Sequence, residues 1–549
     1  MSSITITGQL VDCLTRRVYP ARITVENQHI SRIDPLSDDP ENTQLPYILP
    51  GFVDAHVHIE SSMLTPSGFG RLAVVHGTVA TVSDPHEIAN VCGMEGIDFM
   101  IDDSRHTPFK CYFGAPSCVP ATQFETAGAS LDSADVRALL ERPEIHYLSE
   151  MMNYPGALHG DPEVMAKINA AHALGKPVDG HAPGLRGDAA KAYAQRGIST
   201  DHECFTLEEA LEKISYGMKI IIREGSAARN FEALAPLVDS HPDMVMFCSD
   251  DKHPDSLVEG HINLLCARAA ARGSDPFNII RVACVNPVRH YALEVGLLQT
   301  GDPADFILVK DLSRFEVLET WINGACVARQ GQSLVALAPE QPGRNYPNQF
   351  NCALRQPQDF RIPALPGQPY ALPVIEAFDG QLITGKLPLQ PKRSGSAWEA
   401  DPEQDLLKIV VVNRYHEAPV AKAFIRNFGL KQGALASSVA HDSHNIVAVG
   451  VDDEHLCRAI NGVIRHRGGI SCVKDNFEMV IPLPVAGLMS PGDGYRVAAL
   501  YTLIDQAAKA AGSTLRAPFM TLSFMALLVI PHLKLSDKGL FDGDRFAFC

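Results

Sequence analysis

The alternation of two kinds of segment between about residues 50 and 300 constrains the fold more than any other feature of this sequence. Short apolar, β-branched segments typical of buried strands alternate with amphipathic stretches such as "TLEEALEKISYG", which are typical of helices and end near a glycine. Eight such strand–helix units over about 250 residues match the length of a parallel (β/α)8 barrel. The predicted strands are residues 52–58, 78–84, 109–115, 145–150, 177–181, 197–203, 218–224 and 244–251.

An open, doubly wound sheet is the alternative fold for such an alternation. That fold places a glycine-rich G-x-G-x-x-G turn after its first strand when it binds a dinucleotide, and no such turn follows residues 52–58. We therefore expect an α/β fold built on a (β/α)8 barrel of the TIM type.

Two histidines stand at the end of the first predicted strand, in "FVDAHVHIESS". Side chains of a strand alternate between its two faces, so His56 and His58 point the same way. Two neutral imidazoles on one face suit a shared cation. An isolated H-x-H pair would more often be two partly buried histidines bonded to the backbone.

Further ionisable residues stand at the ends of later strands, and they favour the cation. The carboxyl ends of all eight strands meet at one face of a barrel, where active sites are built. Four histidines and at least two carboxylates would converge there, as a first shell for a divalent metal such as zinc, iron or manganese. These strand-end residues are His56, His58, Glu150, His181, His202, Asp250 and Asp251.

The composition excludes several other classes of protein. With 47 basic and 64 acidic residues the net charge is −17, which disfavours a nucleic-acid partner. The first residues lack the pattern of a signal peptide, and the most apolar tract, residues 519–533, is too short to cross a bilayer. The 13 cysteines are scattered and form no C-x-x-C pair, which indicates reduced thiols in the cytoplasm.

Several long motifs resemble those of one enzyme family over nearly the whole chain. They resemble the bacterial adenine deaminases, within the metal-dependent amidohydrolase superfamily. The motifs are "PGFVDAHVHIESSMLTP", "DPHEIANVCG", "SEMMNYPG", "DGHAPGL", "IREGSAARN", "CSDD", "SSVAHDSHNIVAVG", "LPLPVAGLMS" and "LKLSDKGLF".

The resemblance implies hydrolytic deamination of adenine to hypoxanthine and ammonia, in purine salvage, by a metal-activated hydroxide. It also implies a small-molecule substrate and a homo-oligomer, with no nucleic-acid or membrane partner. A pair of divalent ions is expected, manganese or iron with zinc as a further option. By resemblance, Glu150 bridges the pair, and the remaining ligands are His56, His58, His181, His202 and Asp250.

The same resemblance implies the domain organisation. Residues 1–49 and 300–335 are expected to join into one small β-sandwich beside the barrel of residues 50–299. A linker rich in Pro, Gln and Asn over residues 336–360 would lead to a separate C-terminal α+β domain at 361–549. In this last domain we expect "HDSH" (441–444) to form a turn and not a second metal site.

The mechanism assigns roles to further residues. Asp250 is a predicted proton shuttle between the attacking water and the leaving amine. Glu87, with His86 and Asp251 nearby, is our prediction for the raised-pKa acid that protonates the purine ring at N1, although "SDPHE" also suits a plain helix cap. Asp251, Glu60 and Ser226 are expected to touch the substrate.

Beside these residues, Arg223 and Glu224 in "IIIREGSAARN" are expected to pair with each other. Three other functions compete with the main hypothesis. Another nucleobase deaminase or a cyclic amidase would use the same metals, and a non-catalytic scaffold would keep only the fold. Cytidine-type deaminases are excluded, because they need a P-C-x-x-C motif and this chain has none.

Overall fold

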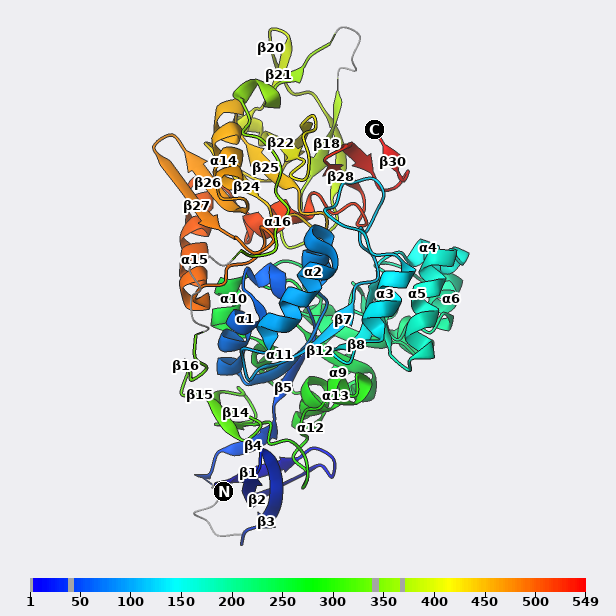
Figure 1. The fold of residues 1–549 in the computed structure, drawn as a ribbon, viewed down its shortest axis with the longest axis vertical. Coiled ribbons are helices and arrows are strands. Elements are labelled where there is room, and N and C mark those ends of the chain that lie inside the picture. Colours follow the sequence, from blue (N-terminus) through cyan, green and yellow to red (C-terminus); the bar gives the residue numbers. More distant parts are fainter. Residues whose placement is uncertain (1–2, 38–43, 338–344, 366–370) are drawn as a thin grey trace.

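The computed structural model describes residues 3–37, 44–337, 345–365 and 371–549. Its centre is a barrel of eight parallel strands surrounded by helices (Figure 1). All eight predicted strands are present. They are β5 (Phe52–Val57), β6 (Thr78–Ser83), β7 (Lys110–Ala115), β8 (Ile145–Met151), β9 (Val178–Gly180), β10 (Thr200–Asp201), β11 (Lys219–Arg223) and β12 (Val245–Cys248).

Two isolated bridges close the barrel. Strands β5 to β9 form one parallel sheet in sequence order, and β10 to β12 form a second. A parallel bridge between Val178 and Ile198 joins the sheets at one side, and a bridge between Val57 and Asp250 joins them at the other. The Asp250 amide also donates to the His56 carbonyl at 3.0 Å. The closed sheet confirms the predicted fold class and brings all carboxyl ends of the strands to one rim.

Burial explains why the strands are nearly continuous apolar runs. Every residue of β5 and β6 is buried, as expected for a parallel sheet covered by side chains inside and by helices outside. The first helices along the barrel are α1 (Pro66–Ala73), α2 (His86–Ser104), α3 (Ser133–Leu140), α4 (Tyr154–His159), α5 (Pro162–Ala173), α6 (Gly187–Gln195) and α7 (Leu207–Ser215). Those that follow are α8 (Phe231–Leu234), α9 (Leu237–Ser240), α10 (Pro254–Glu259), α11 (Ile262–Ala271), α12 (Pro276–Ile280) and α13 (Asn286–His290).

The segments before and after the barrel share one eight-stranded sheet. Its core contains Ile23 and Ile48 from the first segment and Phe306 and Trp321 from the second. The strand order is β16 (Gln332–Ser333), β15 (Ala325–Arg329), β14 (Val317–Ile322), β13 (Phe306–Val309), β4 (Tyr47–Pro50), β1 (Ile4–Asp12), β2 (Arg17–Glu26) and β3 (His29–Pro35). The domain boundaries stay a prediction, and residues 338–344 of the predicted linker lie outside the described residues.

The C-terminal part contains a second eight-stranded sheet. Helix α14 (Asp453–Arg465) covers it through an apolar stripe that includes Leu456, Ile460 and Val463. The strand order is β19 (Gly385–Leu389), β18 (Leu372–Glu376), β23 (Ala421–Arg426), β22 (Leu406–Val412), β25 (Ile446–Gly450), β24 (Ala434–Ser437), β26 (Gly469–Lys474) and β27 (Phe477–Pro482). Outside this sheet lie α15 (Gly494–Ala510), α16 (Pro518–Phe524), β28 (Leu533–Ser536), β29 (Gly539–Asp542) and β30 (Ala547–Phe548).

The C-terminal part lies at one end of the barrel and the N-terminal sheet at the other (Figure 1). Backbone contacts join the C-terminal part to the carboxyl rim of the barrel, since the Ser490 amide donates to the Met63 carbonyl at 2.8 Å. The Asn445 side-chain amide donates to the Thr126 carbonyl, also at 2.8 Å. In the described part of the chain, none of the helices has the length and apolar character needed to cross a bilayer.

Candidate metal centre and substrate cavity

The six residues that the sequence predicted as metal ligands lie together at the carboxyl rim of the barrel. The Nε2 atoms of His56 and His58 are 3.2 Å apart, and His58 Nε2 lies 3.4 Å from Asp250 Oδ1. Glu150 stands between the two halves of the group, with Oε1 3.4 Å from His58 Nε2 and Oε2 3.1 Å from His202 Nε2. His181 Nδ1 lies 2.7 Å from Glu150 Oε2. We call these six residues the floor.

Burial and charge make the floor carboxylates suitable ligands. Burial alone would raise the pKa of Glu150, but His181 and His202 hold that pKa well below its ordinary value. Burial would likewise raise the pKa of Asp250, yet Arg223 and His58 hold it well below. Both groups are therefore ionised near neutral pH.

The histidines also fit a pair of cations. Burial, with His202 and His58 nearby, places the pKa of His56 well below its ordinary value, so this imidazole is neutral. His56 Nδ1 and His181 Nε2 have no hydrogen-bond partner among the described residues. Four imidazoles and two carboxylates, all buried, form a mixed nitrogen and oxygen set that suits zinc, iron or manganese.

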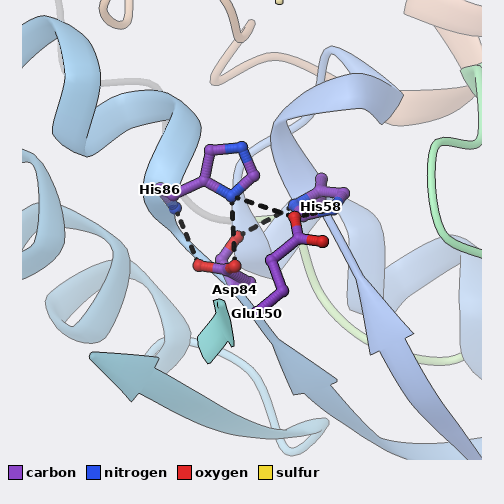
Figure 2. Close-up of side chains that lie close together, drawn as sticks. All are labelled: His58, Asp84, His86 and Glu150. Carbon is purple, nitrogen blue, oxygen red and sulfur yellow. Dashed lines mark hydrogen bonds and ion pairs between the residues drawn. The ribbon is translucent and has the colours of Figure 1, made fainter. Parts of the chain in front are cut away.

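A second group of donors lies beside the floor at the end of β6 (Figure 2). Figure 2 shows His86 directed at Asp84 and Glu150 near His58. His86 Nδ1 lies 3.1 Å from Asp84 Oδ2 and 3.6 Å from Glu150 Oε1. The sequence predicted His86 as a site residue and missed Asp84, because an aspartate just before a helix usually serves as its cap.

The predicted pairing of Arg223 with Glu224 is wrong. Adjacent residues of a strand point to opposite faces, so the two side chains cannot meet across β11. Arg223 points to the barrel rim, where it forms ion pairs with Glu203 and with Asp250 Oδ2, the latter at 2.7 Å. Glu224 instead pairs with Arg268 at 2.6 Å.

The "HDSH" segment reaches the same cavity from the C-terminal part. It does form a turn, as predicted, but His441 Nε2 also lies 2.7 Å from Glu87 Oε1, and His444 Nε2 lies 3.1 Å from Glu87 Oε2. Burial would raise the pKa of Glu87, but these two imidazoles hold it well below its ordinary value. The neighbouring Glu60 has a raised pKa instead, since burial and the nearby Glu87 raise the pKa of its carboxyl group to about 8.

The electrostatics therefore differ from the expectation that Glu87 is a neutral acid. The sequence missed His441 and His444 because a local turn explains two histidines three residues apart, and their distance to residue 87 is set only by tertiary structure. The appearance of "HDSH" within a family-like motif was the one signal available.

Floor and C-terminal residues enclose a small cavity of about 30 Å³. The side that faces the floor, here called the roof, consists of Leu382, His441, Asp442, Phe524 and Leu527. The remaining residues of its wall are His58, His86, Glu87, Glu150, Met152, His181, His202, Glu203, Arg223, Asp250 and Asp251.

The three predicted substrate residues, Asp251, Glu60 and Ser226, differ in their position relative to this cavity. Asp251 lines it and accepts a hydrogen bond from Ser61 Oγ at 2.6 Å. Glu60 lies behind the wall, where its Oε1 accepts from the Ile88 amide at 3.2 Å. Ser226 lines a neighbouring cavity of about 370 Å³, and its Oγ accepts from the His253 amide at 2.8 Å.

Comparison with known proteins agrees with this architecture. Residues 47–327 match the amidohydrolase family, and residues 381–547 match the adenine deaminase C-terminal domain. The chain is 55% identical to an adenine deaminase of Salinibacter ruber, over all of this chain and 98% of the relative. It is 54% identical to that of Sulfurovum sp. and 52% identical to that of Methanosarcina acetivorans, each over 98% of both chains.

The barrel and its rim of histidines and carboxylates thus define the protein class as amidohydrolase. The full-length matches identify the family within this class: the chain belongs to the adenine deaminase family.

Proposed function

We propose that this protein is an enzyme that hydrolyses adenine to hypoxanthine and ammonia. The observation that carries the proposal is the complete floor. All six strand-end donors lie together, and all of them except His56 line one cavity, in a chain with adenine deaminase relatives of 46–55% identity. A scaffold without chemistry would have no reason to bury four imidazoles and two ionised carboxylates around one cavity.

In this proposal the floor residues, Glu150 among them, would hold two divalent cations. Manganese or iron is our prediction, with zinc as a further option. When bound, such a pair would supply a hydroxide nucleophile from water near neutral pH. Arg223 forms an ion pair with Asp250 Oδ2 at 2.7 Å and so orients the carboxylate. The other oxygen, Asp250 Oδ1, faces His56 and His58.

Asp250 is the residue to which we assign a proton transfer during the reaction. Water adds to C6 of the ring and the amino group leaves as ammonia, so the water oxygen gives one proton to the departing nitrogen and the other to ring nitrogen N1. Asp250 lies at the boundary of floor and cavity, and we assign it this transfer. His86, Glu87 and Asp251 form the wall that would face the purine ring, with Glu87 acting as an ionised partner of His441.

Two wider proposals follow from the same family. The 13 cysteines are all free, which supports a reducing compartment, and we propose that the enzyme acts in cytoplasmic purine salvage. A homo-oligomer remains a prediction from the family resemblance.

Ammonia release from a panel of purines, pyrimidines and cyclic amides tests the function directly. The protein is loaded with manganese, iron or zinc in turn, and each compound is supplied at equal concentration. We expect adenine to be converted with the highest kcat/KM. Turnover of guanine or a hydantoin without turnover of adenine would assign the protein to another amidohydrolase activity.

A further inference from the structure

Asp442 is a roof residue that the chemistry above does not use. It belongs to the loop between β24 and β25, and its side chain lines the catalytic cavity with 3% of its surface exposed. Asp442 Oδ1 lies 3.6 Å from His86 Nε2. Asp442 Oδ2 is buried and has no hydrogen-bond partner among the described residues.

The other carboxylates of the cavity wall lie closer to a cationic or donor group than Asp442 does. Glu87 Oε1 and Oε2 lie 2.7 and 3.1 Å from the imidazole nitrogens of His441 and His444, outside hydrogen-bond geometry, and the Arg223 guanidinium donates to Glu203. Asp251 accepts from Ser61 Oγ. Because buried polar atoms are almost always bonded, the unpartnered oxygen of Asp442 marks a position where a ligand atom completes the site.

The chemistry of a carboxylate limits what that ligand atom is. An ionised carboxylate only accepts hydrogen bonds, so the ligand must present an N–H or O–H group. Adenine carries two kinds of N–H donor, the amino group on C6 and the N–H of its imidazole ring. The amino group is the leaving group and belongs at the floor. The donor left for the roof is the imidazole-ring N–H.

We propose that Asp442 is a specificity-determining residue that accepts a hydrogen bond from the imidazole-ring N–H of a purine base. An N9-substituted purine, such as a nucleoside, lacks this N–H and would leave the Asp442 oxygen buried and unpaired. The C-terminal part therefore selects the free base, while the barrel supplies the reaction. This inference rests on the proposed adenine deamination, because it takes the purine to be oriented with C6 at the floor.

The test compares adenine with 9-methyladenine, which lacks the ring N–H, in the metal-loaded full chain. The variants are Asp442→Asn, which keeps the shape of the side chain, and Asp442→Ala. We expect the KM for adenine to rise about ten- to a hundredfold with a smaller change in kcat, as for the loss of one hydrogen bond to a charged group. The preference for adenine over 9-methyladenine should fall by about tenfold or more.

A second measurement does not depend on turnover. Purine and 9-methylpurine lack the amino group, and the ratio of their inhibition constants reports the ring N–H contact alone. Both variants should bring this ratio closer to one. The control is Asp537→Asn, an aspartate of the C-terminal part that accepts from the Thr126 amide and the Asn413 amide, each at 2.9 Å, and does not line the cavity.

The outcomes separate the two proposals. If the wild-type protein converts adenine but both Asp442 variants keep its preferences among substrates and inhibitors, the role of Asp442 is wrong and the proposed function stands. If the wild-type protein converts another compound and not adenine, both proposals fall together.

Discussion

The floor and the roof of the cavity are built in opposite ways. The floor gathers ionised and metal-binding side chains from β5, β8, β9, β10 and β12, which one closed sheet holds at fixed positions. The roof comes from loops and a helix of the C-terminal part, and three of its five residues have apolar side chains that cannot bind a metal. The apolar members are Leu382, Phe524 and Leu527.

The floor therefore suits the chemistry of the site, and the roof suits control of substrate access to it. Rigid strand ends suit metal ligands, which tolerate little displacement. The cavity of about 30 Å³ has room for only a few water molecules, and loops and a helix supply its roof. Loops and short helices move more readily than barrel strands do.

The largest expected effect is at the floor, in Glu150→Gln. The substitution keeps the size of the side chain and removes the charge shared by His58, His181 and His202. We expect metal content and turnover to fall together, the latter by about a hundredfold or more. Elemental analysis and ammonia release from adenine measure the two.

The matched control for the floor is Glu141→Gln, an exposed glutamate that pairs with Arg137. It should leave both quantities unchanged. Full activity of Glu150→Gln with two metal equivalents bound would show that another residue bridges the ions. Glu150 would then not be a metal ligand of the floor.

A smaller effect is expected at the roof, in His441→Gln. This variant removes the imidazole that lies 2.7 Å from Glu87 and 3.3 Å from Asp251, so two buried carboxylates lose a partner. The expected loss of stability is about 3–5 kcal/mol, seen as a lower thermal midpoint, together with a higher KM for adenine. Metal content should stay at the wild-type value, unlike that of the floor variant.

His455→Gln is the control, since His455 belongs to the C-terminal part but pairs with Asp452 and Asp475 away from the cavity. Loss of metal from His441→Gln, with none from the control, would contradict the comparison, because roof and floor would then be one unit.

The smallest effect concerns the support of the roof by Lys534. Its Nζ donates to the Leu382 carbonyl at 2.6 Å and to the Phe524 carbonyl at 2.9 Å, and both of these residues close the cavity. Burial lowers the pKa of Lys534 to about 7. The folded protein therefore binds fewer protons than the unfolded chain between about pH 7 and pH 10.4, so wild-type stability rises with pH in that window.

Lys534→Met removes this dependence. The free energy of unfolding of the wild type relative to the variant should increase from pH 7 to pH 9, by up to about 1.4 kcal/mol per pH unit. The difference between their thermal midpoints should increase with it. Lys431→Met, at an exposed lysine, should show no such trend. A wild-type advantage that shrinks as the pH rises would mean that Lys534 stays charged.

Much of the fold followed from the sequence because its signals are local. The alternation of apolar and amphipathic segments predicted each barrel strand, and parallel topology then placed Glu150, His181 and His202 at one rim. The predicted Arg223–Glu224 pair was wrong because the prediction considered only the opposite charges of the two residues. It ignored strand alternation, which directs adjacent side chains to opposite faces.

The roof could not be predicted in the same way. The sequence "HDSH" indicated a turn but gave no indication of its contact with Glu87. The sequence around Lys534 likewise gave no indication that this lysine supports the roof. The electrostatic state of Glu87 also depends on this contact, since two imidazoles from the C-terminal part keep it ionised.

The sequence by itself thus determined the barrel, its predicted metal ligands and the family, because strand periodicity and parallel closure turn positions along the chain into positions in space. Only the tertiary structure decided which side chains of the C-terminal part cover the barrel, which carboxyl groups are ionised and where one aspartate oxygen, Asp442 Oδ2, lacks a hydrogen-bond partner among the described residues. The physical reason is that contacts between two separate sheets depend on how their surfaces pack together, and the periodicity within either segment does not predict that packing.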